Sequence, residues 1–197
     1  MAVGCTGDFM TARPNTLRII GGQWRGRKLE FPSIDAIRPT PDRVRETLFN
    51  WLQHSIVGAR CLDLFAGSGA LGFEALSRGA KHVVFVDRDP QVGRYLCETL
   101  QRLQATAGDV HVGDAMQWLK ATPQAFDVVF LDPPFATELL NAVTHMLEAG
   151  GWLASDAFIY IESASSRGVP ALPANWRVIK SKSAGQVGYH LAHRQAA

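Results

Sequence analysis

One stretch constrains the fold of this chain more than any other, Cys61-Leu-Asp-Leu-Phe-Ala-Gly-Ser-Gly-Ala-Leu-Gly72. It starts as a short apolar run, breaks into closely spaced glycines and resumes as a helix, so it predicts a strand, a tight loop and a helix. Gly67, Gly69 and Gly72 have the spacing G-x-G-x-x-G, which allows positive φ and lets a nucleotide-like ligand approach bare backbone. Asp63, just before the glycines, favours a cationic or amino-bearing ligand over a phosphate.

Length and composition are those of one soluble globular domain. The chain has 197 residues, of which 47% are hydrophobic and 19% are charged, and a core of this size needs no second domain. Its longest apolar runs, such as residues 83–86, are far shorter than the ~18 residues that cross a bilayer, and its start does not resemble a signal peptide. Cys5, Cys61 and Cys97 are scattered and odd in number. We therefore expect free thiols, a cytoplasmic protein and no metal site.

Charge is concentrated near the N-terminus. Residues 18–45 contain seven basic and three acidic side chains, a net charge of +4 in a chain whose total is +2. This asymmetry indicates a polyanionic partner, with a solvated basic surface as the alternative. Residues 17–31 predict a hairpin of two short strands, and Thr40 with Pro41 predicts the cap and first position of a helix.

The rest of the chain alternates strands and helices. Residues 1–16 have no periodicity and predict a flexible N-terminus; we expect one domain over 17–197, with the basic hairpin and helix at 17–57 and an α/β core at 58–197. Repeated βα units with apolar strands predict a parallel sheet covered on both faces. We expect strands at 60–65, 82–87, 109–113, 126–131 and 157–162, helices at 69–78, 90–104, 115–120 and 138–148, and a final antiparallel hairpin from 176–183 and 187–193.

Acids mark the ends of four predicted strands: Asp63, Asp87, Asp114 and Asp132. Open parallel sheets bind ligands beyond the carboxyl ends of their strands. Asp87 lies 20 residues after Gly67, where a carboxylate accepts the ribose hydroxyls of a nucleoside, and this fits both NAD and S-adenosylmethionine. Asp114 would stand beside the adenine, and it is also placed to cap the short helix that follows it.

The segment Leu131-Asp132-Pro133-Pro134-Phe135 carries the chemistry. Its two prolines fix φ and remove two N–H donors, so carbonyl groups remain beside a carboxylate and an aromatic ring. This composition suits a planar base with an NH₂ group, whose two protons Asp132 and the Pro133 carbonyl accept while Phe135 stacks on the ring. The alternative is a turn that merely ends a strand.

These motifs, in this order, resemble those of class I S-adenosylmethionine-dependent methyltransferases with an Asp/Asn-Pro-Pro-Phe/Tyr signature. Three further segments resemble the RsmD family, which methylates N2 of one guanine in 16S ribosomal RNA: Arg18–Leu29, Arg38–Trp51 and Ala184–Val187. The resemblance runs from about residue 17 to 193. It implies a Rossmann-like, mostly parallel seven-stranded sheet with one antiparallel strand, and the assembled 30S ribosomal subunit as substrate.

The resemblance also implies roles for individual residues. The residues assigned to RNA would contact its phosphates, which positions the substrate without reading its sequence. For Trp24, one of these residues, packing in the protein core is the alternative role. The resemblance places Asp132, Pro133 and Phe135 in catalysis; Asp63, Phe65, Ala66, Gly67, Gly69, Asp87, Arg88, Asp114 and Ala115 around S-adenosylmethionine; and Arg18, Trp24, Arg25, Arg27, Lys28, Arg38, Arg43 and Arg45 on RNA.

Other functions fit parts of the sequence. An NAD-dependent oxidoreductase would explain the glycines and Asp87 but leaves the Asp-Pro-Pro-Phe segment and the basic N-terminus without a role. A catalytically inactive RNA-binding assembly factor is a second alternative. Among methyltransferases, a DNA adenine-N6 or protein glutamine-N5 enzyme could share residues 132–135, because that motif reports an NH₂ group rather than the molecule that carries it.

Overall fold

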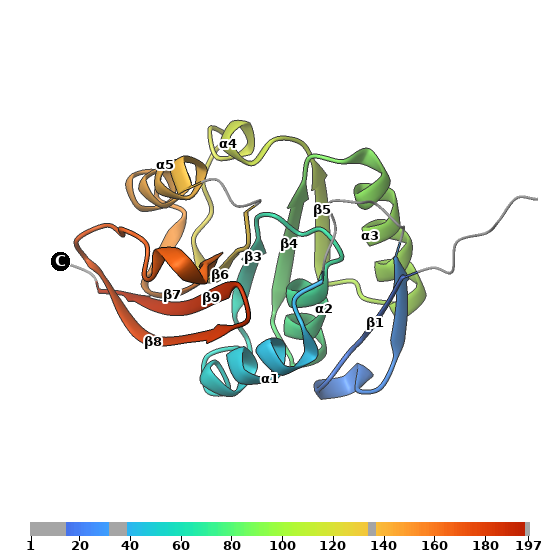
Figure 1. Cartoon of the computed structure of the whole chain (residues 1–197). Coiled ribbons are helices and arrows are strands. Elements are labelled where there is room, and N and C mark those ends of the chain that lie inside the picture. The colour runs from blue at the N-terminus through green and yellow to red at the C-terminus, as the bar shows by residue number, and fades with distance from the viewer. Residues whose placement is uncertain (1–14, 32–38, 134–136, 196–197) are drawn as a thin grey trace, which may run out of the picture.

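The structure is a computed structural model, and it describes residues 15–31, 39–133 and 137–195. Its centre is a seven-stranded sheet with the order β5-β4-β3-β6-β7-β9-β8 (Figure 1). The strands are β3 (Arg60–Asp63), β4 (His82–Asp87), β5 (Gly108–Val112), β6 (Phe126–Leu131), β7 (Leu153–Ala164), β8 (Trp176–Ala184) and β9 (Val187–Arg194).

Only β9 runs against the other strands of this sheet. The pairs from β5 to β7 are all parallel, and β9 pairs antiparallel with both β7 and β8. The expected sheet with one antiparallel strand is therefore confirmed. β7 begins at Leu153 rather than at the predicted residue 157, and its pairing with β6 shifts register between Phe126 and Val128. Ser155 and Asp156 interrupt the apolar run on the exposed side of this bulge, which hid the start of the strand from the sequence pattern.

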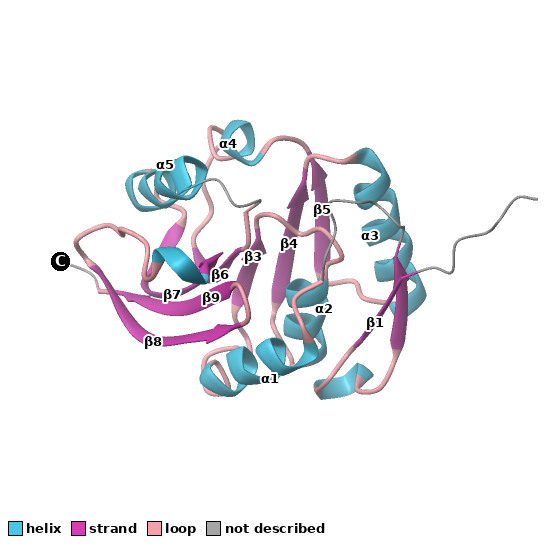
Figure 2. Ribbon diagram, in the orientation of Figure 1, coloured by secondary structure: helices cyan, strands magenta, loops and turns pink. Residues whose placement is uncertain are grey.

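Helices cover both faces of the sheet (Figure 2). Side chains that alternate along each strand belong to two separate clusters, because successive residues of a strand point to opposite faces. One cluster is covered by α1, α2 and α3, and the other by α4 and α5. The helices are α1 (Asp42–Trp51), α2 (Ala70–Ser77), α3 (Pro90–Leu103), α4 (Ala115–Trp118) and α5 (Thr137–Ala149), and within the described ranges no helix is long and apolar enough to cross a membrane.

The N-terminal extension forms a small sheet of its own. β1 (Asn15–Arg18) and β2 (Lys28–Phe31) pair antiparallel around the 3-10 turn η1 (Gly22–Trp24), as the sequence predicts for a hairpin. The inward side chains of this hairpin are buried, and the Phe31 ring lies 6.5 Å from that of Tyr95 on α3. The Trp24 backbone N–H donates to the Ser77 hydroxyl on α2 at 2.9 Å, so the hairpin is docked on the helical layer of the core.

A buried ion pair fixes this docking. Glu74 on α2 is fully buried, and its carboxylate accepts the backbone N–H groups of Ile20 and Gly21, both at 2.8 Å. Arg45 on α1 is 1% exposed and lies 3.4 Å from the same carboxylate. Its guanidinium also donates to the Arg18 carbonyl at 2.8 Å. One carboxylate and one guanidinium therefore join the hairpin, α1 and α2.

The start of α1 differs from the prediction. The helix begins at Asp42, and the residue in the cap position is Pro41, without a side-chain cap bond. The Thr40 hydroxyl, which we expected to cap the helix, donates to Glu162 on β7 at 3.1 Å. The prediction that Thr40 caps α1 is therefore wrong, because the hydroxyl has a buried carboxylate as its acceptor.

Gly72 gives a direct test of the packing of α2 on the sheet. A Cβ at this position would lie 2.1 Å from the ring of Phe85 on β4. We expect Gly72→Ala to destabilise the fold by about 1–3 kcal/mol, as for an overpacked core, measured by urea unfolding. Gly113→Ala is the matched control, since nothing lies within 4 Å of its added Cβ. An additional Phe85→Leu substitution should recover part of the loss; equal stability of the two single variants would contradict this packing.

Candidate active site at the carboxyl edge of the sheet

The glycine loop between β3 and α2 is built partly for a turn and partly for packing. Gly67 and Gly69 have positive φ values of 49° and 69°, which favour glycine. A Cβ on Gly69 would meet the side chains of Phe73 and Leu96, and one on Gly72 would meet Phe85. The two later glycines therefore make room for protein side chains, whereas the sequence analysis had assigned that space to a ligand.

Asp87 ends β4 and holds the glycine loop in place. One oxygen of its carboxylate accepts the Gly67 N–H at 2.8 Å, and the other accepts the Asp89 N–H at 2.9 Å. Each carboxylate oxygen has two acceptor sites, and the side chain is half-buried, so it can still accept hydroxyl groups from a ligand. Asp89 itself caps α3 by accepting the Gln91 N–H at 2.7 Å.

Asp63 is a buried carboxylate at the end of β3. It is 3% exposed and accepts the Gly72 N–H at 3.0 Å. Burial raises its pKa to about 7; the Gly72 hydrogen bond opposes this, and the charges of Asp87 and Glu162 add to it. A cationic ligand placed beside Asp63 would restore its ionised form.

The remaining predicted cofactor residues lie on the loops after the same strands. Asp114 is exposed and caps α4, accepting the Gln117 N–H at 3.0 Å. Arg88 is exposed and Phe65 is half-buried, whereas Ala66 and Ala115 are buried. The four predicted acids thus follow four neighbouring strands, β3 to β6, at one edge of the sheet.

Asp132 directly follows β6 beside a fifth acid. Leu131 pairs with Ile161, so the next residues along the two strands are Asp132 and Glu162. Burial raises the pKa of Asp132 well above its usual range, and the charges of Glu162 and Asp63 raise it further. The charge of either carboxyl group therefore makes ionisation of the other less favourable.

Glu162 is the residue that the sequence analysis missed. It is 6% exposed, and its Oε1 accepts the hydroxyl groups of Thr40 at 3.1 Å and Tyr160 at 2.8 Å. Burial raises its pKa, while the two hydroxyl donors lower it. The signal was present, because Glu162 ends the predicted strand 157–162 just as the other four acids end theirs.

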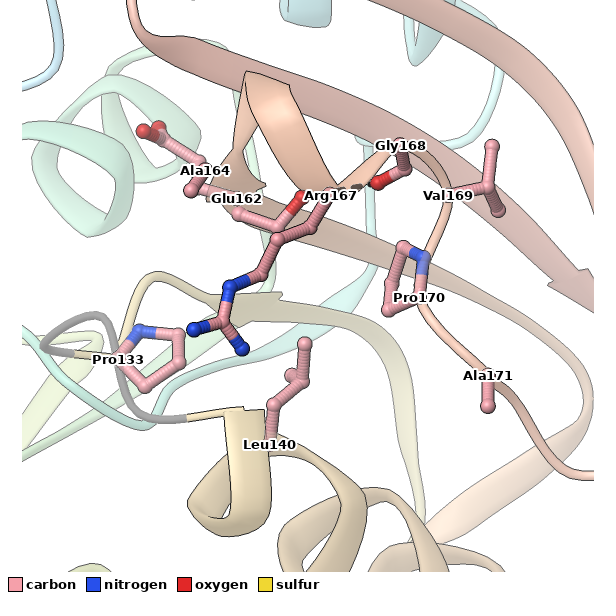
Figure 3. Close-up of a pocket in the computed structure, with 10 residues that line it drawn as sticks. Pro133, Leu140, Glu162, Ala164, Arg167, Gly168, Val169, Pro170 and Ala171 are labelled. Carbon is pink, nitrogen blue, oxygen red and sulfur yellow. Dashed lines mark hydrogen bonds between the residues drawn. The ribbon is translucent and has the colours of Figure 1, made fainter.

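A cavity of about 180 Å³ opens between Pro133 and the end of β7. Its wall includes Pro133, Leu140 on α5 and Glu162, together with residues 163–164 and 167–171. Figure 3 shows the Arg167 side chain reaching across the cavity toward Pro133 and Leu140. A ligand in the cavity would therefore touch Pro133 on one side and the loop after β7 on the other.

The predicted RNA-binding residues divide into two groups. Arg18, Arg25, Arg27, Lys28 and Arg43 are exposed. Trp24 and Arg45 are 6% and 1% exposed, which does not support the prediction that their side chains contact RNA. Trp24 packs in the core, and the Arg45 guanidinium is held by Glu74, Asp42 and two backbone carbonyls. Arg38 and Phe135 lie outside the described residues. In the described ranges, no group of three or more His, Cys, Asp or Glu side chains could hold a metal ion.

Comparisons with known proteins decide the family. Residues 17–193 match the family described as "Conserved hypothetical protein 95". A protein of Escherichia coli K12 named "Ribosomal RNA small subunit methyltransferase D" is 51% identical over 180 residues, which cover 91% of each chain. Its namesake from Haemophilus influenzae is 45% identical over 179 residues, covering 89% of this chain and 92% of that one. The chain belongs to the RsmD family.

Solved structures agree with this assignment. A structure described as a putative methyltransferase from Escherichia coli has a TM-score of 0.88 and 49% identity, and the match covers 93% of this chain and all of that one. A putative RNA methyltransferase from Pyrococcus horikoshii, at 18% identity and a TM-score of 0.61, shares the fold. An RsmD-family chain with this sheet is a class I methyltransferase, so the NAD-dependent alternative is not supported.

The buried Asp63 predicts a characteristic pH dependence of stability. Its folded pKa of about 7 lies above an unfolded value of about 3.9. The folded state therefore binds the proton more tightly, and stability is lost as pH rises from about 4 to 7. Asp63→Asn keeps an acceptor for Gly72 and avoids this loss. We expect the variant to gain roughly 2–3 kcal/mol relative to wild type between pH 5 and pH 8 in urea unfolding. Parallel pH curves for the two proteins would contradict the assigned pKa.

Proposed function

We propose that this protein transfers a methyl group from S-adenosylmethionine to the exocyclic N2 amine of a guanine in 16S ribosomal RNA within the assembled small subunit. One observation carries the proposal: Asp132, half-buried and followed by two prolines, directly follows β6, the neighbour of the strand β3 that ends at Asp63 and leads into the glycine loop. The names of the relatives support an RNA of the small subunit as substrate.

The described residues fit S-adenosylmethionine, which supplies an electrophilic methyl group when it is bound. Asp63 is buried and has a raised pKa, as suits a carboxylate that accepts the ammonium group of a ligand. Asp87 is half-buried and would accept the ribose hydroxyls, while Asp114 would accept the adenine amine. Phe65, Ala66, Gly67, Arg88 and Ala115 would line the same site, and Gly69 would shape the loop rather than touch the ligand.

Asp132 and the Pro133 carbonyl would accept the two protons of the target amine, with Phe135 stacked on the base. Holding both N–H bonds directs the nitrogen lone pair, which is otherwise delocalised into the ring, at the methyl group. Most of the rate would come from this positioning, for which effective molarities give about 7–11 kcal/mol. The raised pKa of Asp132 also suits it to take the proton that the amine loses after transfer.

The exposed basic residues of the extension would bind RNA phosphates: Arg18, Arg25, Arg27, Lys28 and Arg43. Arg38 joins this proposal from outside the described residues. Such contacts position the substrate and do not read its sequence. A base must leave its stack to enter a cavity of this kind, so a looped or splayed RNA segment is the natural target.

Asp132→Ala tests the proposed chemistry. We expect methyl transfer to 30S subunits to be lost, while S-adenosylmethionine binds with an affinity near that of wild type, because the residue contacts the amine rather than the donor. Transfer is measured with tritiated donor and located by nuclease mapping of 16S RNA from a strain that lacks the gene. Asp109→Ala, at an exposed position of β5, is the control. Unchanged turnover in Asp132→Ala would contradict the proposed role of Asp132 in catalysis. If the wild-type protein bound 30S subunits without methyl transfer, an inactive assembly factor would be favoured instead.

Arg43 and Arg45 form a matched pair for the RNA surface. Arg43 is exposed and Arg45 is buried on the same helix. Arg43→Ala should weaken binding to 30S subunits and lower the salt slope by about 1, as for one lost phosphate contact, without changing stability. Arg45→Met should instead cost about 3 kcal/mol in urea unfolding, because it removes the partner of a buried carboxylate. A loss of stability in Arg43→Ala, with unchanged binding to 30S subunits, would contradict the proposed RNA-binding surface.

A further inference from the structure

We infer that Glu162 determines the choice of base by accepting the N1–H of the target guanine while Asp132 holds its N2 amine. This inference rests on the proposed function and adds a residue and a specificity to it. It starts from the position of Glu162 on the strand next to Asp132, at the edge of the sheet where β6 and β7 end.

The two acids point to the same face of the sheet. Partners in a parallel pair share a face, and side chains alternate along each strand. Phe130 pairs with both Asp63 on β3 and Tyr160 on β7, and these two aromatic residues belong to one cluster. Asp132 and Glu162 each lie two residues further along and return to that face. A base held by Asp132 would therefore lie within the reach of Glu162.

The Glu162 carboxylate is anchored through one of its two oxygens. Oε1 accepts the Thr40 and Tyr160 hydroxyls, which fixes the orientation of the side chain before any ligand arrives. Oε2 accepts no hydrogen bond from the described residues, although the side chain is 6% exposed and contributes to the wall of the cavity beside Pro133. The group therefore offers one oriented acceptor on the face of the sheet that carries Tyr160.

Guanine matches two neighbouring acceptors. Its N1–H and N2–H donors lie side by side on the Watson–Crick edge, the edge through which an extruded base is read. Adenine and cytosine carry an acceptor at the ring nitrogen beside their amine, and this acceptor would face the Glu162 oxygen without a hydrogen. A site built to pair with a donor rejects a ligand that lacks it, because its buried polar group is left unpaired.

Electrostatics favour the same ligand. The charge of Glu162 raises the pKa of Asp132, and burial raises the pKa of both acids. Two N–H donors on one neutral base would stabilise both carboxylates at once. A structural role for Glu162 is the competing explanation, since its bond to Thr40 attaches the segment before α1 to the sheet.

The test compares two target bases in the full-length protein. The guanine that wild type methylates is first mapped, and that position is then replaced by 2-aminopurine in reconstituted 30S subunits. This analogue keeps the N2 amine but has an acceptor at N1. We expect wild type to prefer guanine in kcat/KM by about 10- to 150-fold, the range for one hydrogen bond to a charged group.

Glu162→Gln should reverse part of this preference. Its carboxamide can donate to the N1 acceptor of 2-aminopurine, so the guanine preference should narrow at least tenfold. The analogue also lacks O6, but this affects wild type and variant alike. A change in the ratio of kcat/KM for the two bases therefore reports the contact at N1. Tyr160→Phe is the matched control: it removes one anchor of Glu162 but keeps the carboxylate and its bond to Thr40, so the preference should stay as in wild type.

Two outcomes would overturn the inference. The first is a wild-type protein with the same kcat/KM for 2-aminopurine and for guanine. This comparison tests the inference even if Glu162→Gln does not fold. The second is a Glu162→Gln protein that is slower on both bases by the same factor, which would make the role of Glu162 structural. Absence of N2-methylguanosine from the nuclease digest of wild-type reactions would instead overturn the proposed function itself.

Discussion

Repulsion among buried carboxyl groups is the constraint on which this site depends. Asp63 ends β3, Asp132 follows β6 and Glu162 lies near the end of β7; burial raises the pKa of each, and the charges of neighbouring acids raise those of Asp63 and Asp132 further. The protein offsets part of this cost with the Gly72 N–H and with two hydroxyl groups. A ligand that brings an ammonium group or N–H donors would offset the rest of the cost of ionising these acids. The acids therefore favour ligands of that kind.

The N-terminal extension is part of this arrangement rather than an appendage. Thr40 donates to Glu162, and its own carbonyl accepts from the buried Arg45, which contacts Glu74 and the end of β1. A continuous polar network thus runs from the catalytic edge to the hairpin that carries the exposed basic residues. The hairpin and the edge of the sheet that carries Glu162 are therefore joined through one hydrogen-bond network.

Much of this could be predicted from the sequence. β4 and β6 have the bounds that their apolar runs predict, and the acids that end strands lie together because parallel strands end at one edge. Prediction failed where partners are distant in the chain. Arg45 is charged, and the periodicity of its helix gives no reason to bury it; its buried partners include Glu74, which lies 29 residues away in the chain. Thr40 has its acceptor 122 residues away, and Glu162 went unnoticed because its role depends on Asp132.

The central claim is that these acids are held together in a site where their charges depend on the ligand. The most direct measurement is a carboxyl ¹³C NMR titration of the free protein and of its complex with S-adenosylhomocysteine. The account predicts that Asp63 titrates near pH 7 and Asp132 well above the ordinary range in the free protein, and that Asp63 stays ionised to a lower pH in the complex. Titration of all three acids near pH 4 in both states would contradict it.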